Sequence, residues 1–307
     1  MRDCSQSWGV AQLVAELRTI RLQSLENRQR RDHPPKLPSR KVLSQIVDQL
    51  GAALFPNRLG MPELNDEGID YFVGHTLDSL LKRLQQQIAL ELQFVAEQRG
   101  STADVQVQSR QITCEFAGLL PGIRQTLDTD IQAAYEGDPA ALSPDEVLVC
   151  YPGIWAVIHH RVAHALHTLG APLVARVIAE LAHSATGIDI HPGAQIGESF
   201  FIDHGTGVVI GETAIIGNRV RLYQAVTLGA KRFAKDENGA LIKGNLRHPI
   251  VEDDVVIYAG ATILGRITIG RGSVIGGNVW LTHSVPPGSH ISQGLTRNDL
   301  FAEGGGI

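Results

Sequence analysis

Aliphatic residues recur at every sixth position between residues 190 and 281, and this spacing constrains the fold more than any other feature. Neither the 3.6-residue period of a helix nor the two-residue period of a strand explains it. It indicates a solenoid in which each hexapeptide forms one face of a triangular coil, and successive turns pair as parallel strands about 4.8 Å apart. The fourteen positions, with a two-residue shift after the fourth, are Ile190, Ile196, Ile202, Val208, Ile210, Ile216, Leu222, Leu228, Val251, Ile257, Ile263, Ile269, Ile275 and Leu281.

The residues before these repeats carry apolar side chains at helical spacing instead. The run Ser143-Pro144-Asp145-Glu146 is a helix-start signal, because it offers a capping hydroxyl, a proline in the first turn and acids near the positive end of the helix dipole. We therefore predict an α+β chain with three parts. These are an all-helical N-terminal domain over residues 1–186, a parallel β-helix over residues 187–291 and a flexible tail over residues 292–307.

Composition narrows the function classes. A net charge of −5 argues against a general nucleic-acid binder, which needs a basic face. No long apolar stretch opens the chain, so we expect neither a signal peptide nor a membrane span. The three cysteines are scattered, which favours reduced thiols in the cytoplasm over a disulfide framework or a zinc site.

Polar and charged residues interrupt the hexapeptide repeats at a few positions. Residues 230–245 are polar and break the period, so we expect a loop extruded from the coil. The other interruptions are Asp189, Asp203-His204 and Arg247-His248. A histidine beside a carboxylate can take a proton from a hydroxyl, and Asp189 and His204 lie 15 residues apart, close to one turn of about 18. Each group alone is an ordinary corner residue, but together they indicate a site.

The repeats and these groups resemble the serine O-acetyltransferases, a family of hexapeptide-repeat acyltransferases. The resemblance covers about residues 127–287 and implies a left-handed coil. It also implies acetyl-CoA as the donor and L-serine as the acceptor, giving O-acetylserine for cysteine synthesis. The motifs that carry it are Thr186-Gly187-Ile188-Asp189-Ile190-His191-Pro192, Asp203-His204-Gly205-Thr206-Gly207, Gly211-Glu212-Thr213, Val226-Thr227-Leu228-Gly229 and Arg247-His248-Pro249.

The resemblance implies a role for each polar group. His204 is expected to be the general base, with Asp189 as the partner that orients it. Asp203 and Asp130 are expected to bind the serine ammonium. Arg247 is expected to clamp the carboxylate, with His248 beside it. Paired acids suit an ammonium, and a bidentate guanidinium suits a carboxylate. Serine bound in this way would hold its hydroxyl beside His204 and would attack the thioester directly.

Donor sites in this family lie in grooves between the coils of adjacent chains. Gly229 and Ala259 match that region, and Lys231, Arg232 or Arg266 could meet the phosphates. Plain solvation of these basic residues is an equally good reading. Tyr258 stands where many family members have glycine, which leaves the path of the pantetheine arm open.

The family also implies partner chains. Its coils form homotrimers and its helical domains pair trimers into hexamers; the sequence leaves open which applies, and whether cysteine inhibits. Residues 304–307, Gly-Gly-Gly-Ile, resemble the family's tail that enters the active site of O-acetylserine sulfhydrylase. A C-terminal isoleucine such as Ile307 also arises by chance, so a terminus without a partner remains the alternative.

Three rival functions remain. Left-handed coils also host zinc carbonic anhydrases, and His160, His164 and His167 have ligand-like spacing on one predicted helix. No acid or cysteine completes that set, so we favour an amphipathic helix and expect no metal. An acetyltransferase for a sugar or xenobiotic would not need Asp130 and Arg247. A non-catalytic scaffold that binds the sulfhydrylase would not need the Asp189 and His204 pair.

Overall fold

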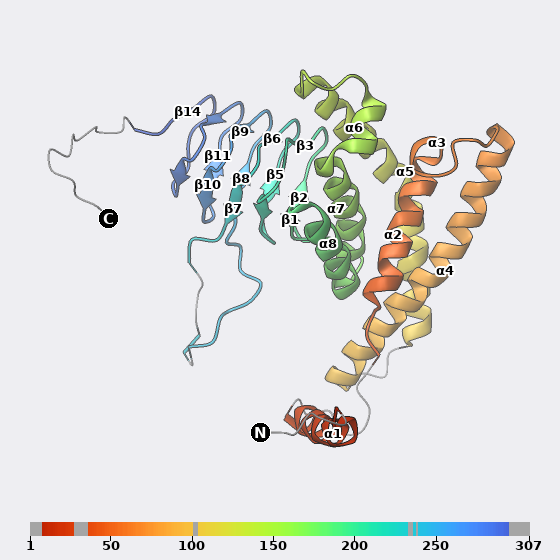
Figure 1. Cartoon of the computed structure of the whole chain (residues 1–307). Coiled ribbons are helices and arrows are strands. Elements are labelled where there is room, and N and C mark those ends of the chain that lie inside the picture. The colour runs from red at the N-terminus through yellow and green to blue at the C-terminus, as the bar shows by residue number, and fades with distance from the viewer. Residues whose placement is uncertain (1–7, 28–35, 101–103, 233–235, 238, 295–307) are drawn as a thin grey trace.

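A computed structural model describes residues 8–27, 36–100, 104–232, 236–237 and 239–294. Helices fill the first part and short strands the second, and the change falls at Gly187, which ends the last helix in a left-handed conformation (Figure 1). The described helices are α1 (Val10–Asn27), α2 (Arg40–Leu54), α3 (Pro56–Leu59), α4 (Asp66–Arg99), α5 (Val105–Gly137), α6 (Pro144–Cys150), α7 (Pro152–Thr168) and α8 (Pro172–Thr186).

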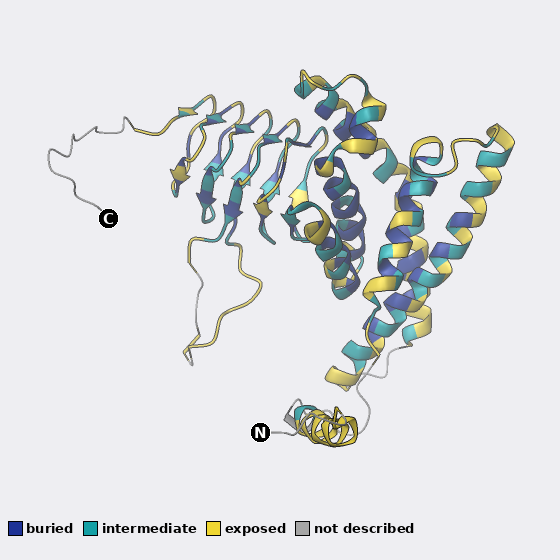
Figure 2. Cartoon of the chain, viewed as in Figure 1, coloured by how far each residue is buried: buried dark blue, intermediate teal, exposed yellow. Residues whose placement is uncertain are grey.

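Capping side chains fix where the helices begin. Ser143 accepts a hydrogen bond from the Glu146 N–H at 3.1 Å, so α6 starts where the sequence predicts. Asn65 and Asp104 cap α4 and α5 in the same way. Apolar faces of α2, α4, α5, α7 and α8 pack on one another. By contrast, the side of α1 seen in Figure 2 is exposed along its length.

The strands wind into a coil of three parallel sheets, with one strand per sheet in each complete turn, as the six-residue spacing predicts. We name them sheet A (β1, β4, β7, β10, β13), sheet B (β2, β5, β8, β11) and sheet C (β3, β6, β9, β12, β14). Their bounds are β1 (Asp189–Ile190), β2 (Gln195–Ile196), β3 (Phe201–Ile202), β4 (Val209–Ile210), β5 (Ile215–Ile216), β6 (Arg221–Leu222), β7 (Thr227–Gly229), β8 (Ile250–Val251), β9 (Val256–Ile257), β10 (Thr262–Leu264), β11 (Thr268–Ile269), β12 (Val274–Ile275), β13 (Trp280–Leu281) and β14 (His290–Ile291).

The six-residue repeat builds the core of the coil. Thirteen of the fourteen predicted aliphatic positions are buried, and the other, Ile196, packs against the same core. Burying each such side chain contributes about 1.5–3 kcal/mol. The core does not divide at Gly187, because Leu127 of α5 and Val157 of α7 share it with Phe200 and Ile202 of the coil. Helices α5, α7 and α8 therefore cover the N-terminal end of the coil (Figure 1).

Two corners of the coil matter for the site. The C–A corner joins each sheet C strand to the next sheet A strand, at residues 203–208, 223–226, 258–261 and 276–279. The A–B corner joins sheet A to sheet B, at residues 191–194, 211–214, 230–249 and 265–267. The extruded loop is the third A–B connection, between β7 and β8 (Figure 1).

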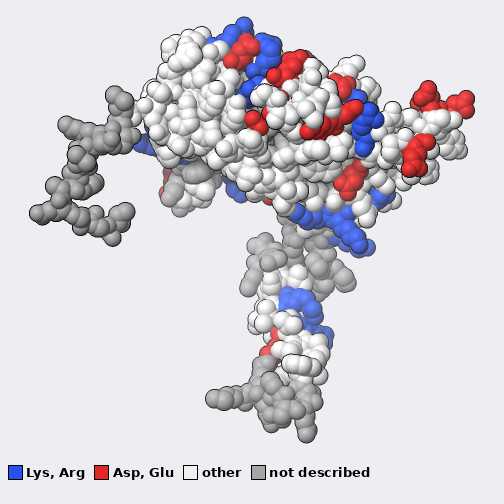
Figure 3. Space-filling view, turned by 45° about the horizontal axis from the view of Figure 1, so that its top comes forward, with Lys and Arg blue, Asp and Glu red and all other residues white. Residues whose placement is uncertain are grey.

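The described surface carries charge of both signs. Acidic and basic side chains are interspersed on the face in Figure 3, and much of the coil seen there is uncharged. None of the helices within the described ranges combines the length and apolar character that crossing a bilayer requires.

Candidate active site

His204 and Asp203 form the first C–A corner, directly after β3. His204 adopts the left-handed conformation with φ of 59°, and Gly205 follows at φ of 83°, so the chain turns sharply here. This turn leaves the His204 side chain 70% exposed, while that of Asp203 is only 13% exposed. The ring Nδ1 lies 3.6 Å from the Asp203 Oδ1. The corner thus presents an accessible imidazole beside a sheltered carboxylate.

Asp138 and Tyr151 reach the same corner from the helical region, and sequence reasoning missed both. Asp138 follows α5 and Tyr151 precedes α7. The Tyr151 hydroxyl donates to Asp138 Oδ2 at 2.5 Å, and the Ala140 N–H donates to Asp138 Oδ1 at 2.8 Å. The hydrogen bond from Tyr151 is the main cause that lowers the pKa of Asp138, and the nearby His204 adds to it. The same bond, with burial and with Asp203 among the nearby acids, raises the pKa of Tyr151 to about 12.

Asp130 does not reach this corner, so its expected role in ammonium binding is not supported. Its side chain is fully buried, and Arg161 donates to both of its oxygens at 3.0 and 3.1 Å. The Phe200 N–H donates to Oδ1 at 2.9 Å. Burial, only partly offset by Arg161, raises the pKa of Asp130 to about 6. Arg161 also donates to the backbone of Ile196 and Gly197, so the pair fastens α5 and α7 to the coil.

Asp189 starts β1 at the edge of sheet A next to the C–A corner. Asp189 pairs with Val209 on the next turn of the coil, and Val209 follows His204 by five residues. Asp189 and His204 therefore lie on neighbouring turns, as the spacing predicts. The Asp189 carboxylate nevertheless lies with Glu180 and His183 of α8, where one ligand atom of each falls within 4.8 Å of the others. Among the hydrogen bonds of the described residues, none joins Asp189 to His204. The orienting role of Asp189 toward His204 therefore stays a prediction.

Arg247 and His248 lie at the A–B corner, where the extruded loop rejoins the coil. The Arg247 Nη2 donates to Glu212 Oε2 at 2.6 Å. The backbone N–H groups of Arg247 and His248 both donate to Thr213 Oγ1, and the Thr213 N–H donates to His248 Nδ1 at 3.0 Å. Burial, with Arg247 nearby, lowers the pKa of His248 to about 4 and keeps it neutral. Gly211 makes room for this ring, since a Cβ there would lie 2.0 Å from its Cδ2.

The two candidate groups stand at opposite edges of sheet A. His204 precedes β4 and Glu212, the partner of Arg247, follows it. The two groups are separated by the width of one coil face. A face of roughly five residues, at ~3.3 Å for each residue, is on the order of 15 Å wide. One amino acid cannot bridge that span. A single chain therefore does not bring its own Arg247 to its own His204.

The expected donor residues are spread over both corners. Ala259 lies on the C–A corner, and Gly229 ends β7 at the edge of the A–B corner. Lys231 is exposed beside Gly265. Arg266 donates to the backbone oxygens of Thr213 and His248 at 2.6 and 3.0 Å, so it holds the A–B corner together. That contact weakens the case for a phosphate ligand at Arg266.

Among the described residues, the histidines of α7 do not gather into a group that could share a metal ion. His160 is buried, and neither ring nitrogen has a hydrogen-bond partner. Burial lowers its pKa well below the usual range. His164 lies 2.9 Å through Nδ1 from the Pro192 oxygen, and the His167 ring contacts His191 instead. Within the described ranges, the side chains close enough to share a metal ion are those of Glu180, His183 and Asp189.

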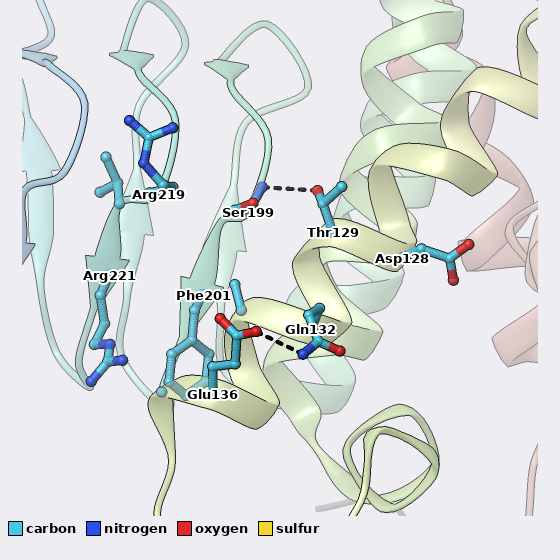
Figure 4. A pocket seen from close by; sticks show the side chains of 11 residues that line it. Asp128, Thr129, Gln132, Glu136, Ser199, Phe201, Arg219 and Arg221 are labelled. Carbon is cyan, nitrogen blue, oxygen red and sulfur yellow. Dashed lines mark hydrogen bonds between the residues drawn. The ribbon is translucent and has the colours of Figure 1, made fainter.

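A cleft of about 660 Å³ lies between α5 and the coil, apart from these corners (Figure 4). Glu136 and Gln132 line its helical side, and Arg219 and Arg221 its coil side. The Ser199 N–H donates to Thr129 Oγ1 at 2.9 Å and closes one end. None of the expected site residues lines this cleft.

Comparison with known proteins places the chain in a family. A model described as bacterial transferase hexapeptide (six repeats) matches residues 248–283. A plasmid-encoded serine acetyltransferase of Synechococcus elongatus is 56% identical over 309 aligned positions, which cover 99% of this chain and 97% of that protein. The chain belongs to the serine acetyltransferases. A Mycobacterium tuberculosis serine acetyltransferase is 52% identical over 162 residues, 53% of this chain and 67% of that protein.

Solved serine acetyltransferases share the architecture. Serine acetyltransferase 1 of Entamoeba histolytica, in complex with L-cysteine, is 37% identical with a TM-score of 0.71, covering 86% of this chain and 90% of that one. The soybean enzyme complexed with serine is 31% identical with a TM-score of 0.53, covering 81% and 95%. The coil is thus the left-handed β-helix that the family resemblance implies.

Proposed function

We propose that this serine acetyltransferase family member transfers the acetyl group of acetyl-CoA to the hydroxyl of L-serine, giving O-acetyl-L-serine and free CoA for cysteine biosynthesis. The observation that carries the proposal is the C–A corner. There the accessible imidazole of His204 lies beside Asp203 and near Asp138, so a base and two carboxylates converge. The solved soybean relative with serine bound supports this choice of acceptor.

The acceptor would bind by charge. Asp203 and Asp138 would hold the ammonium, with Asp138 replacing Asp130 in that role. His204 would take the proton from the serine hydroxyl as its oxygen attacks the thioester carbon. The thiolate of CoA leaves and takes up that proton, so no covalent enzyme intermediate is needed. Asp189 would orient His204 once its carboxylate turns from His183.

The carboxylate clamp would come from a second copy of the chain. Arg247 stands across sheet A from His204, so it would serve a neighbour's C–A corner. Contacts between different patches on identical chains form a ring when the rotation between chains closes, and the trimer that the family resemblance implies would be such a ring. The donor would then lie in the groove between two coils, near Gly229, Ala259 and Lys231. A homotrimer, or a pair of trimers, is the assembly that supplies a complete site.

The deciding experiment is the release of free CoA from acetyl-CoA with and without L-serine. We expect release only with serine. Equal release with water would overturn the acetyl transfer, and equal release with a sugar acceptor would favour the rival acetyltransferase. Chelation should leave the rate unchanged, because the proposed chemistry uses no metal. We place the enzyme in the cytoplasm, where its thiols would stay reduced.

We separately propose that the C-terminal tail, residues 292–307, binds a partner protein. Ile307 lies outside the described residues. It would bind O-acetylserine sulfhydrylase, with its carboxylate standing in for that of the substrate. Calorimetry of the sulfhydrylase with a peptide ending in residues 303–307 tests it. Heat that O-acetylserine abolishes is expected, and the absence of heat at high micromolar peptide would remove the partner.

A further inference from the structure

The C–A corner carries a ladder of equivalent residues along the coil axis. Strand register places Tyr223 one turn after Asp203 and Tyr258 one turn after Tyr223. Gly276 and then Ser292 occupy the next two rungs. Because turns repeat at about 4.8 Å, the rung of Gly276 lies roughly 14 Å from that of Asp203.

The two tyrosines already form a stack. Their ring centroids are 5.0 Å apart and the ring planes differ by 12°. Arg221 Nη1 donates to the Tyr223 hydroxyl at 3.5 Å. Tyr258 is 43% exposed, although a large aromatic residue gains most from burial.

Beyond Tyr258 the ladder lacks a side chain. Gly276 fills the next rung, and a Cβ there would lie 3.0 Å from the Ile291 oxygen. Two turns, about 10 Å, therefore separate the rungs of Tyr258 and Ser292. Aromatic rings stack comfortably within such a gap. Ala259 and Gly277, beside these rungs, are also small.

We propose that this slot receives the purine ring of the acyl donor, stacked on Tyr258 as the third ring of the ladder. The inference rests on the proposed acetyl transfer from acetyl-CoA. Helices α5, α7 and α8 cover the N-terminal end of the coil, so a long donor with its thioester at His204 extends toward β14. Its pantetheine arm spans the distance from His204 toward the rung of Gly276 without contacting the Tyr258 ring, and the purine then stacks on that ring. Tyr258 is thus a specificity-determining residue for the nucleotide part of the donor.

The test compares two acetyl donors, of which only one carries the nucleotide with its purine. Initial rates are measured with acetyl-CoA and with acetyl-pantetheine, which lacks the nucleotide, for the full-length enzyme and for Tyr258→Leu and Tyr258→Phe. Stacking of a base on an aromatic side chain is worth about 1–3 kcal/mol, so Tyr258→Leu should raise the KM for acetyl-CoA about 5- to 150-fold. Its KM for acetyl-pantetheine should not change. Tyr258→Phe keeps the ring and should keep the wild-type KM for both donors.

Other outcomes discriminate clearly. An equal rise for both donors would place Tyr258 on the pantetheine arm and overturn the proposal. A lower KM for acetyl-CoA in Tyr258→Leu would show that the ring obstructs the groove. Adenosine 3′,5′-bisphosphate is the probe for direct binding, and its competitive inhibition should weaken in Tyr258→Leu but not in Tyr258→Phe. Tyr71→Leu, at an exposed position of α4, is the matched control. Failure of acetyl transfer itself would appear as wild-type enzyme that releases no CoA with serine.

Discussion

The Tyr151 hydroxyl donates to Asp138 across the junction between α5 and α7, at 2.5 Å. This bond aims a carboxylate from the helical region at the corner that carries His204. Removing the hydroxyl in Tyr151→Phe should release Asp138 and raise the KM for L-serine about tenfold, the equivalent of one charge-assisted hydrogen bond. The KM for acetyl-CoA should not change. Equal changes in both constants would mean that Tyr151 only supports the fold.

Asp138→Asn tests the same carboxylate directly. It removes the charge that would hold the serine ammonium, so the KM for serine should rise more than in Tyr151→Phe. The lowered pKa of Asp138 means that the carboxylate stays ionised as pH falls below the usual aspartate range. The KM for serine should therefore stay constant from neutral pH down to mildly acidic pH. Asp128→Asn, at an exposed position of α5, is the control, and a matching rise in that variant would remove Asp138 from the acceptor site.

His204→Ala removes the proposed base. We expect kcat to fall about 10²–10⁴-fold, the usual loss for general-base catalysis. Asp189→Asn should cost less. Near-normal turnover of His204→Ala, measured as CoA release at saturating serine, would exclude His204 from the role.

Mixed oligomers test whether the site is shared between chains. His204→Ala and Arg247→Ala should each be nearly inactive, the second through a higher KM for serine. In an even mixture of the two chains, about a quarter of shared sites would combine an intact His204 with an intact Arg247. Co-expression of the two variants should therefore restore about a quarter of wild-type activity. No recovery in verified mixed oligomers would mean that each chain supplies both residues.

The sequence predicts the coil well because burial at every sixth position is a local rule, which thirteen of the fourteen aliphatic positions obey. It also marks Asp203-His204 and Arg247-His248 as candidate site residues at the corners, and their chemical roles stay predictions. It fails where long-range packing decides. Leu127, Asp130, Ile131 and Ala134 follow helical spacing and are all buried on one stripe of α5, so the helix phase already pointed Asp130 inward. Asp138 lies just past that helix, where no period applies, and only the fold shows that it meets Tyr151.

The Asp130 and Arg161 pair gives the last prediction, because a structural role and a substrate-binding role differ in what they change. Asp130→Asn would leave the Arg161 charge buried without its partner, which typically costs 3–5 kcal/mol of unfolding free energy. The folded fraction should keep its KM for serine.

The pKa of Asp130 is raised to about 6 from 3.8, so the native state binds the extra proton between these values. The stability contributed by that proton is fully present below about pH 4 and is lost as pH rises through 6. Denaturant unfolding at pH 5 and at pH 7 should therefore show that the wild type loses about 1 kcal/mol of unfolding free energy over this interval, relative to Asp130→Asn. A variant with wild-type stability but a raised KM for serine would return Asp130 to the acceptor site.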